Sequence, residues 1–356
     1  MVLRVLGLKQ EQTYGNLKTG VTNPDFHHKM TDGNFGLNDD PVTSSDGSRM
    51  TQMARAGACK PSGSVKGKCD LKRVGHFLKG FFDNYEFTEG ETNTPNIHEF
   101  WGGDNPYLTS FTGWATFDEF QKLLKGLLIE NLKFDVSNEW LEQSVDFIYK
   151  DETASMINQS TYTVRNVAGA IPIMFYDVTV ELFDKDEDEL VVGIKNSLSF
   201  DGKNNHNQDK TLGLGSRKPQ VQALAQKREI TVAIGSTLTR DSASTILAIE
   251  YGEDGALSPS TCKVYNLGVK VTIQSCGISN EKLTMILPSC TANVDYSMSG
   301  SDEIETKFNL VSLGTGEVTL ADEETTVKTD CYFKLENNIP VISPDNNWTS
   351  SLIEEE

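Results

Sequence analysis

The stretch LKFDVSNEWLEQSVDFIYKDE, residues 132–152, decides how this sequence is interpreted. It predicts two strands joined by a polar turn. In its second part Val145 and Phe147 alternate with Glu142 and Asp146. Alternation with a period of two residues is typical of an antiparallel strand that is buried on one side only. We therefore expect a hairpin with one apolar face and one acidic face.

A similar stretch, TANVDYSMSGSDEIETKFNLVSLG, follows at residues 291–314 and alternates in the same way. A slip of one residue in register would exchange the two faces, so the pattern assigns each side chain to one side. The apolar side expected for the two hairpins consists of Val145, Phe147, Tyr149, Ile304, Phe308 and Leu310. The acidic side consists of Asp135, Glu142, Asp146, Asp295, Glu303 and Glu305.

A second correspondence supports a duplication. The pattern V-x5-L-x-R begins at Val65 and again at Val232, and a segment with helical potential follows each copy. This predicts a tandem repeat, with a first module over residues 1–165, a second over 166–336 and a C-terminal tail over 337–356. Chance similarity between two β-rich segments is the alternative that the sequence leaves open.

Length and composition limit the classes of protein to which the chain can belong. The chain has 356 residues, an apolar fraction of 37% and a net charge of −19. It is long enough for a sizeable core or two domains, and its charge disfavours binding to nucleic acid, because phosphates repel an acidic surface. The N-terminus lacks the apolar run of a signal peptide, and no segment is long and apolar enough to span a membrane. The six cysteines lack metal-site spacing and are expected to be buried free thiols.

A coarse secondary structure follows from the apolar spacing. A strand at Val65 and a helix over 71–81 are predicted, and Gly15–Pro61 is interpreted as long loops or an extended arm. Residues 83–114 are interpreted as a loop-rich insertion, and the capping-box spacing at Thr116 predicts a helix over 116–128. Further strands are expected within residues 178–201, 228–238, 262–274, 282–289 and 325–336. The fold class is therefore mainly β with a few helices.

None of the local motifs predicts an enzyme or a cofactor site. The residues Asp184, Asp186 and Asp188 are spaced as in a calcium loop, but Glu189 stands where the turn needs glycine, so a solvated acidic turn is preferred. The segment GLGSRK at 213–218 lacks the context of a phosphate-binding loop.

The histidines are not interpreted as ligands either. His27 and His28 are adjacent in an expected loop without a neighbouring acid or cysteine, and His76 lies in the predicted helix. No nucleophile elbow and no distinct acid and base pair stands out. We expect no catalytic residue, no cofactor and no metal.

Four segments together resemble a major tail tube protein of long-tailed bacteriophages: LGLKQEQTYG, SGSVKGKCDLKRVGHFLKGFF, REITVAIGSTLTR and LPSCTANVDYSMSGSDEIETKFNLVSLGTG. The resemblance implies tail-tube-like β-sandwich or barrel modules, two per chain, whose long hairpins form a barrel shared around a ring. Rings would stack into a hollow tube through which DNA passes without specific binding. The acidic side of the hairpins would face the lumen.

The resemblance also implies partners and a location. The chain would form homotrimeric rings if it is duplicated and homohexameric rings if it is not, and it would meet tape-measure, baseplate and terminator proteins in the tail of a virion assembled in the host cytoplasm. A surrounding sheath is a further candidate partner. Two alternatives stay open: a tail terminator or baseplate ring, and a capsid-decoration or adhesion β-domain.

Overall fold

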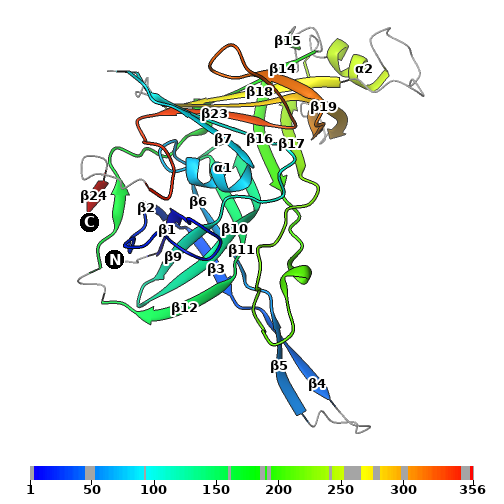
Figure 1. Cartoon of the computed structure of the whole chain (residues 1–356). Coiled ribbons are helices and arrows are strands. Elements are labelled where there is room, and N and C mark those ends of the chain that lie inside the picture. Colours follow the sequence, from blue (N-terminus) through cyan, green and yellow to red (C-terminus); the bar gives the residue numbers. More distant parts are fainter. Residues whose placement is uncertain are drawn as a thin grey trace.

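The structure is a computed structural model of the whole chain. It describes residues 4–44, 53–91, 94–158, 162–184, 189–190, 194–239, 243–251, 266–275, 281–297, 304–345 and 353–355. Within these residues the chain forms 24 strands and only two α-helices, which confirms the predicted mainly-β class (Figure 1).

The largest sheet has eight antiparallel strands and contains the predicted hairpin of residues 132–152. In this hairpin Leu132 lies opposite Val145, as the alternation required. The strands, in order across the sheet, are β3 (Asp32–Gly36), β6 (Ser62–Lys68), β11 (Glu142–Ile148), β10 (Phe120–Val136), β16 (Ile194–Lys203), β17 (Glu229–Thr237), β20 (Glu305–Ser312) and β19 (Lys282–Ser297).

Two smaller sheets branch from the long strands β10 and β19. Gly126, with a φ of 65°, lies in the irregular part of β10, where the strand leaves one sheet for the other. The first branch consists of β2 (Phe26–Lys29), β1 (Arg4–Gln10), β9 (Phe111–Phe117), the start of β10, and β12 (Asp151–Met156). The second consists of β15 (Glu189–Leu190), β14 (Val178–Phe183), β18 (Asn266–Gln274), the start of β19, β23 (Tyr332–Asn337), β8 (Asn96–Trp101) and β7 (Asn84–Thr88).

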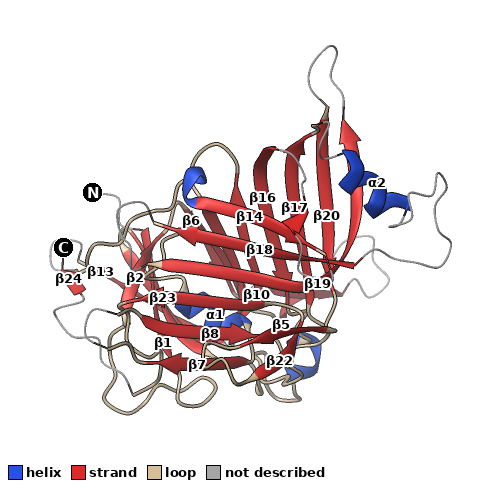
Figure 2. Ribbon diagram, turned by 90° about the horizontal axis from the view of Figure 1, so that it is seen from above, coloured by secondary structure: helices blue, strands red, loops and turns tan. Residues whose placement is uncertain are grey.

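The remaining elements are short. In Figure 1 the β4–β5 hairpin projects from the body at the end opposite α2, and Figure 2 shows β14, β18 and β23 running across the direction of β16, β17 and β20. The elements are α1 (Gly75–Phe81), α2 (Ala243–Tyr251), the 3-10 turns η1 (Phe175–Asp177) and η2 (Gln208–Thr211), and the pairs β4 (Asp39–Ser44) with β5 (Met53–Cys59), β21 (Gly316–Thr319) with β22 (Thr326–Thr329), and β13 (Arg165–Val167) with β24 (Ile353–Glu355).

The order of strand pairing in the first half recurs in the second. The series β2–β1–β9–β10–β11–β6–β3 has the same connections as β15–β14–β18–β19–β20–β17–β16. Val65 in β6 pairs with Val145, and Val232 in β17 pairs with Leu310. A helix follows β6 and another follows β17. The pairing of β10 with β16, called the internal junction below, joins the two series into one sheet.

One main apolar core lies behind the eight-stranded sheet. It includes residues from Leu6 to Ile342, so both sides of the predicted boundary near residue 165 contribute to it. Helix α1 begins at Gly75, within the predicted helical segment 71–81, and all seven of its residues are buried, whereas the apolar spacing predicted burial of one face only. In the described part of the predicted tail, Ile339 and Ile342 are buried. The thiols of Cys59, Cys69, Cys290 and Cys331 are buried, as expected, and are not disulfide-bonded, whereas Cys262 and Cys276 lie outside the described residues.

The prediction of a helix over residues 116–128 was wrong. This segment contains the end of β9, a two-residue turn and the start of β10. Asp118 in that turn has a φ of 45°, which suits a hairpin and not a helix. The helical spacing was misleading because β10 is covered on both sides here, and Leu127, Leu128 and Ile129 are all fully buried.

Two other segments are more regular than expected. Gly15–Pro61 was interpreted as loops or an arm, yet it contributes β2 and β3 to the sheets and forms the β4–β5 hairpin. The insertion at 83–114 contains β7, β8 and the start of β9, and β8 pairs with β23 of the second half. Glycine and asparagine obscured the strand pattern in these edge segments, where pairing with a neighbour supplies the order.

Candidate functional site

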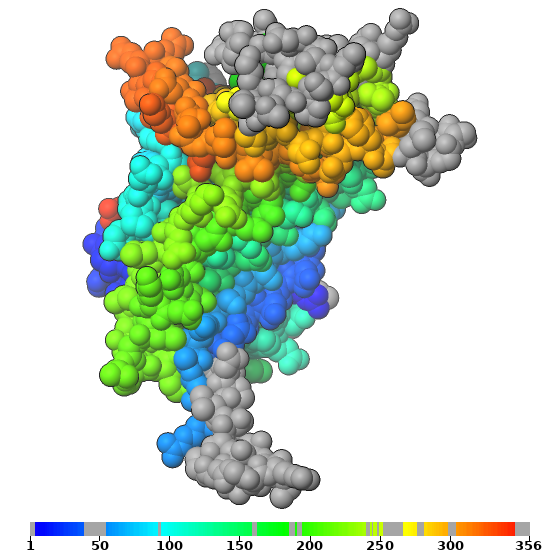
Figure 3. Space-filling model, turned by 90° about the vertical axis from the view of Figure 1, so that its right-hand side faces the viewer, coloured from blue at the N-terminus to red at the C-terminus, as the bar shows by residue number. Residues whose placement is uncertain are grey.

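The side of the eight-stranded sheet that faces away from the core is polar along all eight strands, and we call it the polar face. It carries serine, threonine, asparagine and charged side chains together with the apolar Ala233 and Val311, and none of its charged residues is buried. Its carboxylates are those of Asp32, Asp135, Glu142, Asp146, Asp201, Glu229, Asp295 and Glu305. Its lysines are Lys66, Lys68, Lys133, Lys203 and Lys307. In Figure 3 adjoining bands of blue, teal, green and orange follow this strand order across one side of the molecule.

The polar face brings together five of the six residues expected on the acidic side. Asp135, Glu142, Asp146, Asp295 and Glu305 all lie on it, and Glu303 lies outside the described residues. On the opposite side Val145, Phe147, Tyr149, Phe308 and Leu310 are buried in the core. Ile304 is only partly buried and precedes the first residue of β20.

Lysines and amides on neighbouring strands offset much of the acidity. Lys66 Nζ lies 2.7 Å from Glu142 Oε2, and Lys133 Nζ lies 2.8 Å from Asp135 Oδ2. The Asn131 side chain donates a hydrogen bond of 2.8 Å to Asp146. Sequence reasoning omitted these lysines because it treated each hairpin alone, and only the register shows which charges are neighbours. Such exposed pairs contribute at most about 1 kcal/mol each, so the face is weakly acidic and well hydrated.

The polar face is hollowed at one end. A depression of about 800 Å³ lies between the β10–β11 turn and strands β16, β17, β20 and β19. Trp140 and Glu139 line it from the turn, and Ser197, Ala233 and Lys307 line it from the strands.

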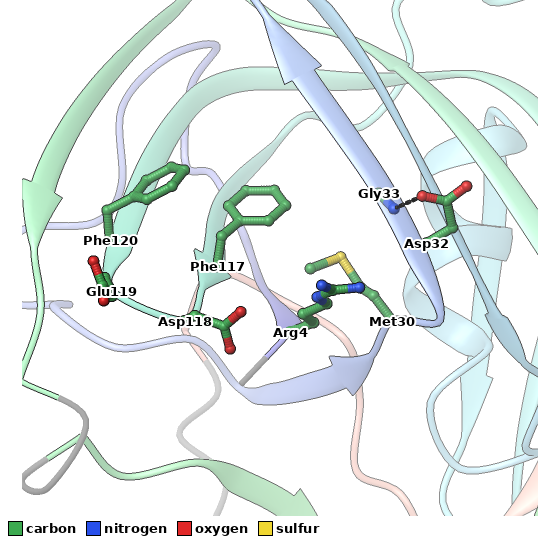
Figure 4. Close-up of a pocket in the computed structure, with 8 residues that line it drawn as sticks. All are labelled: Arg4, Met30, Asp32, Gly33, Phe117, Asp118, Glu119 and Phe120. Carbon is green, nitrogen blue, oxygen red and sulfur yellow. Dashed lines mark hydrogen bonds between the residues drawn. The ribbon is translucent and has the colours of Figure 1, made fainter. Parts of the chain in front are cut away.

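The two outermost strands of the sheet have no second partner strand among the described residues. These are β3 at one end and residues 292–297 of β19 at the other. A pocket of about 540 Å³ opens beside β3, and Figure 4 shows Met30, Phe117 and Phe120 in its lining. Phe120 is 38% exposed. In the same view the Asp32 carboxylate accepts a hydrogen bond of 2.8 Å from the backbone N–H of Gly33.

The buried ionisable groups lie in the core and do not reach the polar face. His27 and His28 are in β2 and not in a loop, so that interpretation was wrong. Burial lowers the pKa of His27 and of His98 to about 4, and it lowers the pKa of His28 and His76 as well. Lys9 Nζ lies 2.7 Å from Asp25, whose other oxygen lies 3.0 Å from His76 Nε2.

The described part of the chain contains no group of three or more His, Cys, Asp and Glu side chains arranged to hold a metal ion. No helix there has the length and hydropathy to cross a membrane. Most of the acidic turn at 184–189 lies outside the described residues, so the calcium interpretation stays untested.

The sequence matches no protein-family model, and no curated protein matches it. Within its described residues the chain offers an extended, hydrated surface between two strand edges that lack a second partner strand.

Proposed function

We propose that this chain is a structural protein of a phage tail tube, which forms rings that stack into a hollow conduit for DNA. The observation that carries the proposal is the eight-stranded sheet, whose outer side is mainly polar and whose two outermost strands have no second partner strand among the described residues. An open edge presents unsatisfied N–H and C=O groups that pair readily with another strand. Joining the edges of successive copies would close the sheet into a barrel with the polar face inside.

The recurrence of the pairing order supports two tandem modules in each chain. Each series contributes four strands to the eight-stranded sheet, and the internal junction joins them. A ring of three chains would then contain six modules in nearly equivalent positions. This is a closed arrangement in which each copy contacts the next by one repeated interface.

The expected width of the barrel favours three copies. With strands about 4.8 Å apart and tilted by about 40°, a barrel of 24 strands is about 50 Å across between backbones. Side chains on the inner wall reduce this to about 40 Å. Two copies would leave about 20 Å, the width of a bare duplex without its hydration shell. Three copies therefore give a channel that DNA could traverse.

The charge of the polar face suits passage without adhesion. Eight carboxylates and five lysines leave it weakly negative, and the whole chain carries −19. Binding to DNA is driven largely by the release of counterions from phosphates that basic side chains neutralise. Three of the five lysines, Lys66, Lys133 and Lys203, lie within 4 Å of a carboxylate, so the wall offers little of that gain. DNA would slide past it.

Electron microscopy of the purified full-length protein over a range of concentrations and salt tests this proposal. We expect hollow tubes built of rings with three chains each. The control is Tyr296→Pro: the alternation along β19 directs the N–H of residue 296 to the open edge, beyond the part of β19 that pairs with β18, and proline there is tolerated by an edge strand but blocks an added strand. This variant should stay folded and form no rings.

Other outcomes separate the alternatives. Single rings that never stack would favour a terminator or baseplate ring. Rings of six chains would keep the ring and contradict the duplication. Monomers at every concentration and salt would contradict the proposal and favour a decoration or adhesion module.

A further inference from the structure

We propose that β3 of one copy pairs antiparallel with residues 292–296 of β19 in the next copy, with Asn34 opposite Asn293. This inference rests on the proposed ring, and it adds the residues that join the copies. It follows from the internal junction, which already shows one instance of this pairing inside the chain. There the C-terminal half of β10 pairs with β16.

The two strand series give the correspondence of residues. In the first series Val65 pairs with Gly33, and in the second Val232 pairs with Phe200. Position 33 in β3 therefore corresponds to position 200 in β16. In the same way Leu132 pairs with Val145, and Ala292 pairs with Leu310. Position 132 in β10 therefore corresponds to position 292 in β19.

The residues that pair at the internal junction therefore indicate which residues would pair between copies. Lys133 lies opposite Asp201 in the internal junction. Their corresponding residues are Asn293 and Asn34. Position 292 would then face position 35 of the next copy, and position 294 would face position 33.

The backbone hydrogen bonds at both edges agree with this register. Leu313 N–H donates to Ser289 O, and the alternation of an antiparallel ladder then directs the backbone of Asn293 to β20 and that of Val294 to the open edge. On β3 the N–H of Gly33 donates to the Asp32 side chain and not to a strand. Val294 and Gly33 would thus exchange hydrogen bonds across the new junction. Asn293 and Asn34 would form the neighbouring pair without hydrogen bonds.

The two helices supply a second, independent observation. Every residue of α1 is buried, and part of its cover comes from across the internal junction. The Phe81 ring lies directly over Gly202 of β16, and Asn204 Nδ2 donates 3.1 Å to the Phe81 carbonyl. Helix α2 lies against β19, the counterpart of β10, but its Leu247 is 51% exposed. The missing cover would be β3 of the next copy, beside the pocket that Phe120 lines together with Arg4, Asp118 and Glu119.

Disulfide crosslinking tests the register. Asn34 and Asn293 are both exposed on the polar face, so cysteine at either position should leave the fold intact. We expect the double variant Asn34→Cys/Asn293→Cys to form intermolecular disulfides under mild oxidation, with trimers as the largest covalent product. Antiparallel pairs without hydrogen bonds bring Cα atoms to about 4.5 Å, within the range of a disulfide.

The matched control is Asn34→Cys/Thr291→Cys, which is out of register by two residues. Its Cα atoms would lie about 7–8 Å apart, too far for a disulfide, so at least a tenfold lower yield is expected. The single-cysteine variants and the unmodified chain report any contribution from the native thiols.

Each further outcome has one meaning. Rings in the microscope without the expected crosslink would overturn this junction and leave the proposed function standing. A chain that forms no rings at all would overturn both. A higher yield from the shifted pair would overturn the register.

Discussion

The two halves of the chain use the same order of strands but differ in what covers their helices. Helix α1 is sealed between its own sheets and second-half residues such as Gly202, whereas α2 leaves Leu247 half exposed. The first half meets the next strand series inside the chain, while the second half ends at an open edge. Two helices in equivalent positions of the two strand series can therefore differ in burial, because only the first is covered by residues of the other series within the same chain.

Truncation of one apolar side chain in each helix, Phe81 in α1 and Leu247 in α2, should show the largest difference between the two halves. We expect Phe81→Ala to lower the free energy of unfolding by about 3–5 kcal/mol, because the ring is fully buried over Gly202. The matched change Leu247→Ala should cost less than about 0.5 kcal/mol in the unassembled chain, since half of that side chain is in water. Denaturant unfolding at low protein concentration measures both.

In ring assembly we expect Leu247→Ala to have a larger effect than it has on the stability of the single chain. If α2 is covered by the next copy, Leu247→Ala raises the concentration at which rings form although the chain remains stable. Equal losses of stability in the two variants would contradict the assigned difference between the helices.

Acidification should destabilise the first half of the chain more than the second, and the loss of stability from each histidine should be smaller than that from Phe81→Ala. His27 and His98 lie in the first half, and burial lowers the pKa of each from 6.5 to about 4. Above pH 6.5 both are neutral in the folded and unfolded chain, so they add no pH dependence. As the pH falls from 6.5 towards 4, the unfolded chain binds protons that the folded chain does not, and stability falls by about 2 kcal/mol per histidine at pH 5.

Hydrogen exchange at pH 7 and pH 5 measures this effect by region. Amides of β2 and β8 should lose protection before those of β17 and β20, because the only histidine of the second half is His206. His98→Gln should reduce the pH dependence by one proton. A uniform loss of protection across both halves would show that other groups control acid stability.

The sequence predicted the elements whose two faces differ and missed those whose faces do not. The hairpin at 132–152 alternates cleanly, because one side faces the core and the other faces solvent. The same strand a few residues earlier was taken for a helix, because Leu124 and Leu127–Ile129 are buried on both sides and lose the period of two. Strands β2 and β3 were missed because tertiary pairing, not propensity, orders them.

The sequence predicted which side chains of each hairpin lie on the polar face, but not which side chains of other strands lie next to them. Alternation placed Glu142 and Asp135 on one side, but no local pattern shows that Lys66 and Lys133 stand beside them. That information lies in the register between strands that are far apart in sequence. The faint repeat V-x5-L-x-R was the one long-range signal, and its two valines occupy corresponding positions in the sheet.

The smallest expected effect concerns one pair of facing residues at each of the two junctions. In the internal junction Asp135 faces Ser199, whereas the corresponding pair between copies is Asp295 and Asp32. Like charges directly opposite each other on neighbouring strands are unfavourable by about 0.2–1 kcal/mol. Asp32 also holds the N–H of Gly33, which the next copy would need. If the copies pair as proposed, Asp32 would therefore oppose pairing at this edge.

Asp32→Ser makes the junction between copies resemble the internal one. We expect rings to form at a concentration up to about fivefold lower, which is the equivalent of about 1 kcal/mol. The mirror change, Ser199→Asp, places a second carboxylate opposite Asp135 inside the chain and should lower the free energy of unfolding by a similar amount. Light scattering against protein concentration measures the first effect and denaturant unfolding the second. If Asp32→Ser left the assembly concentration unchanged while Ser199→Asp destabilised the chain, the two junctions would not be equivalent, and the register assigned to the ring would be wrong.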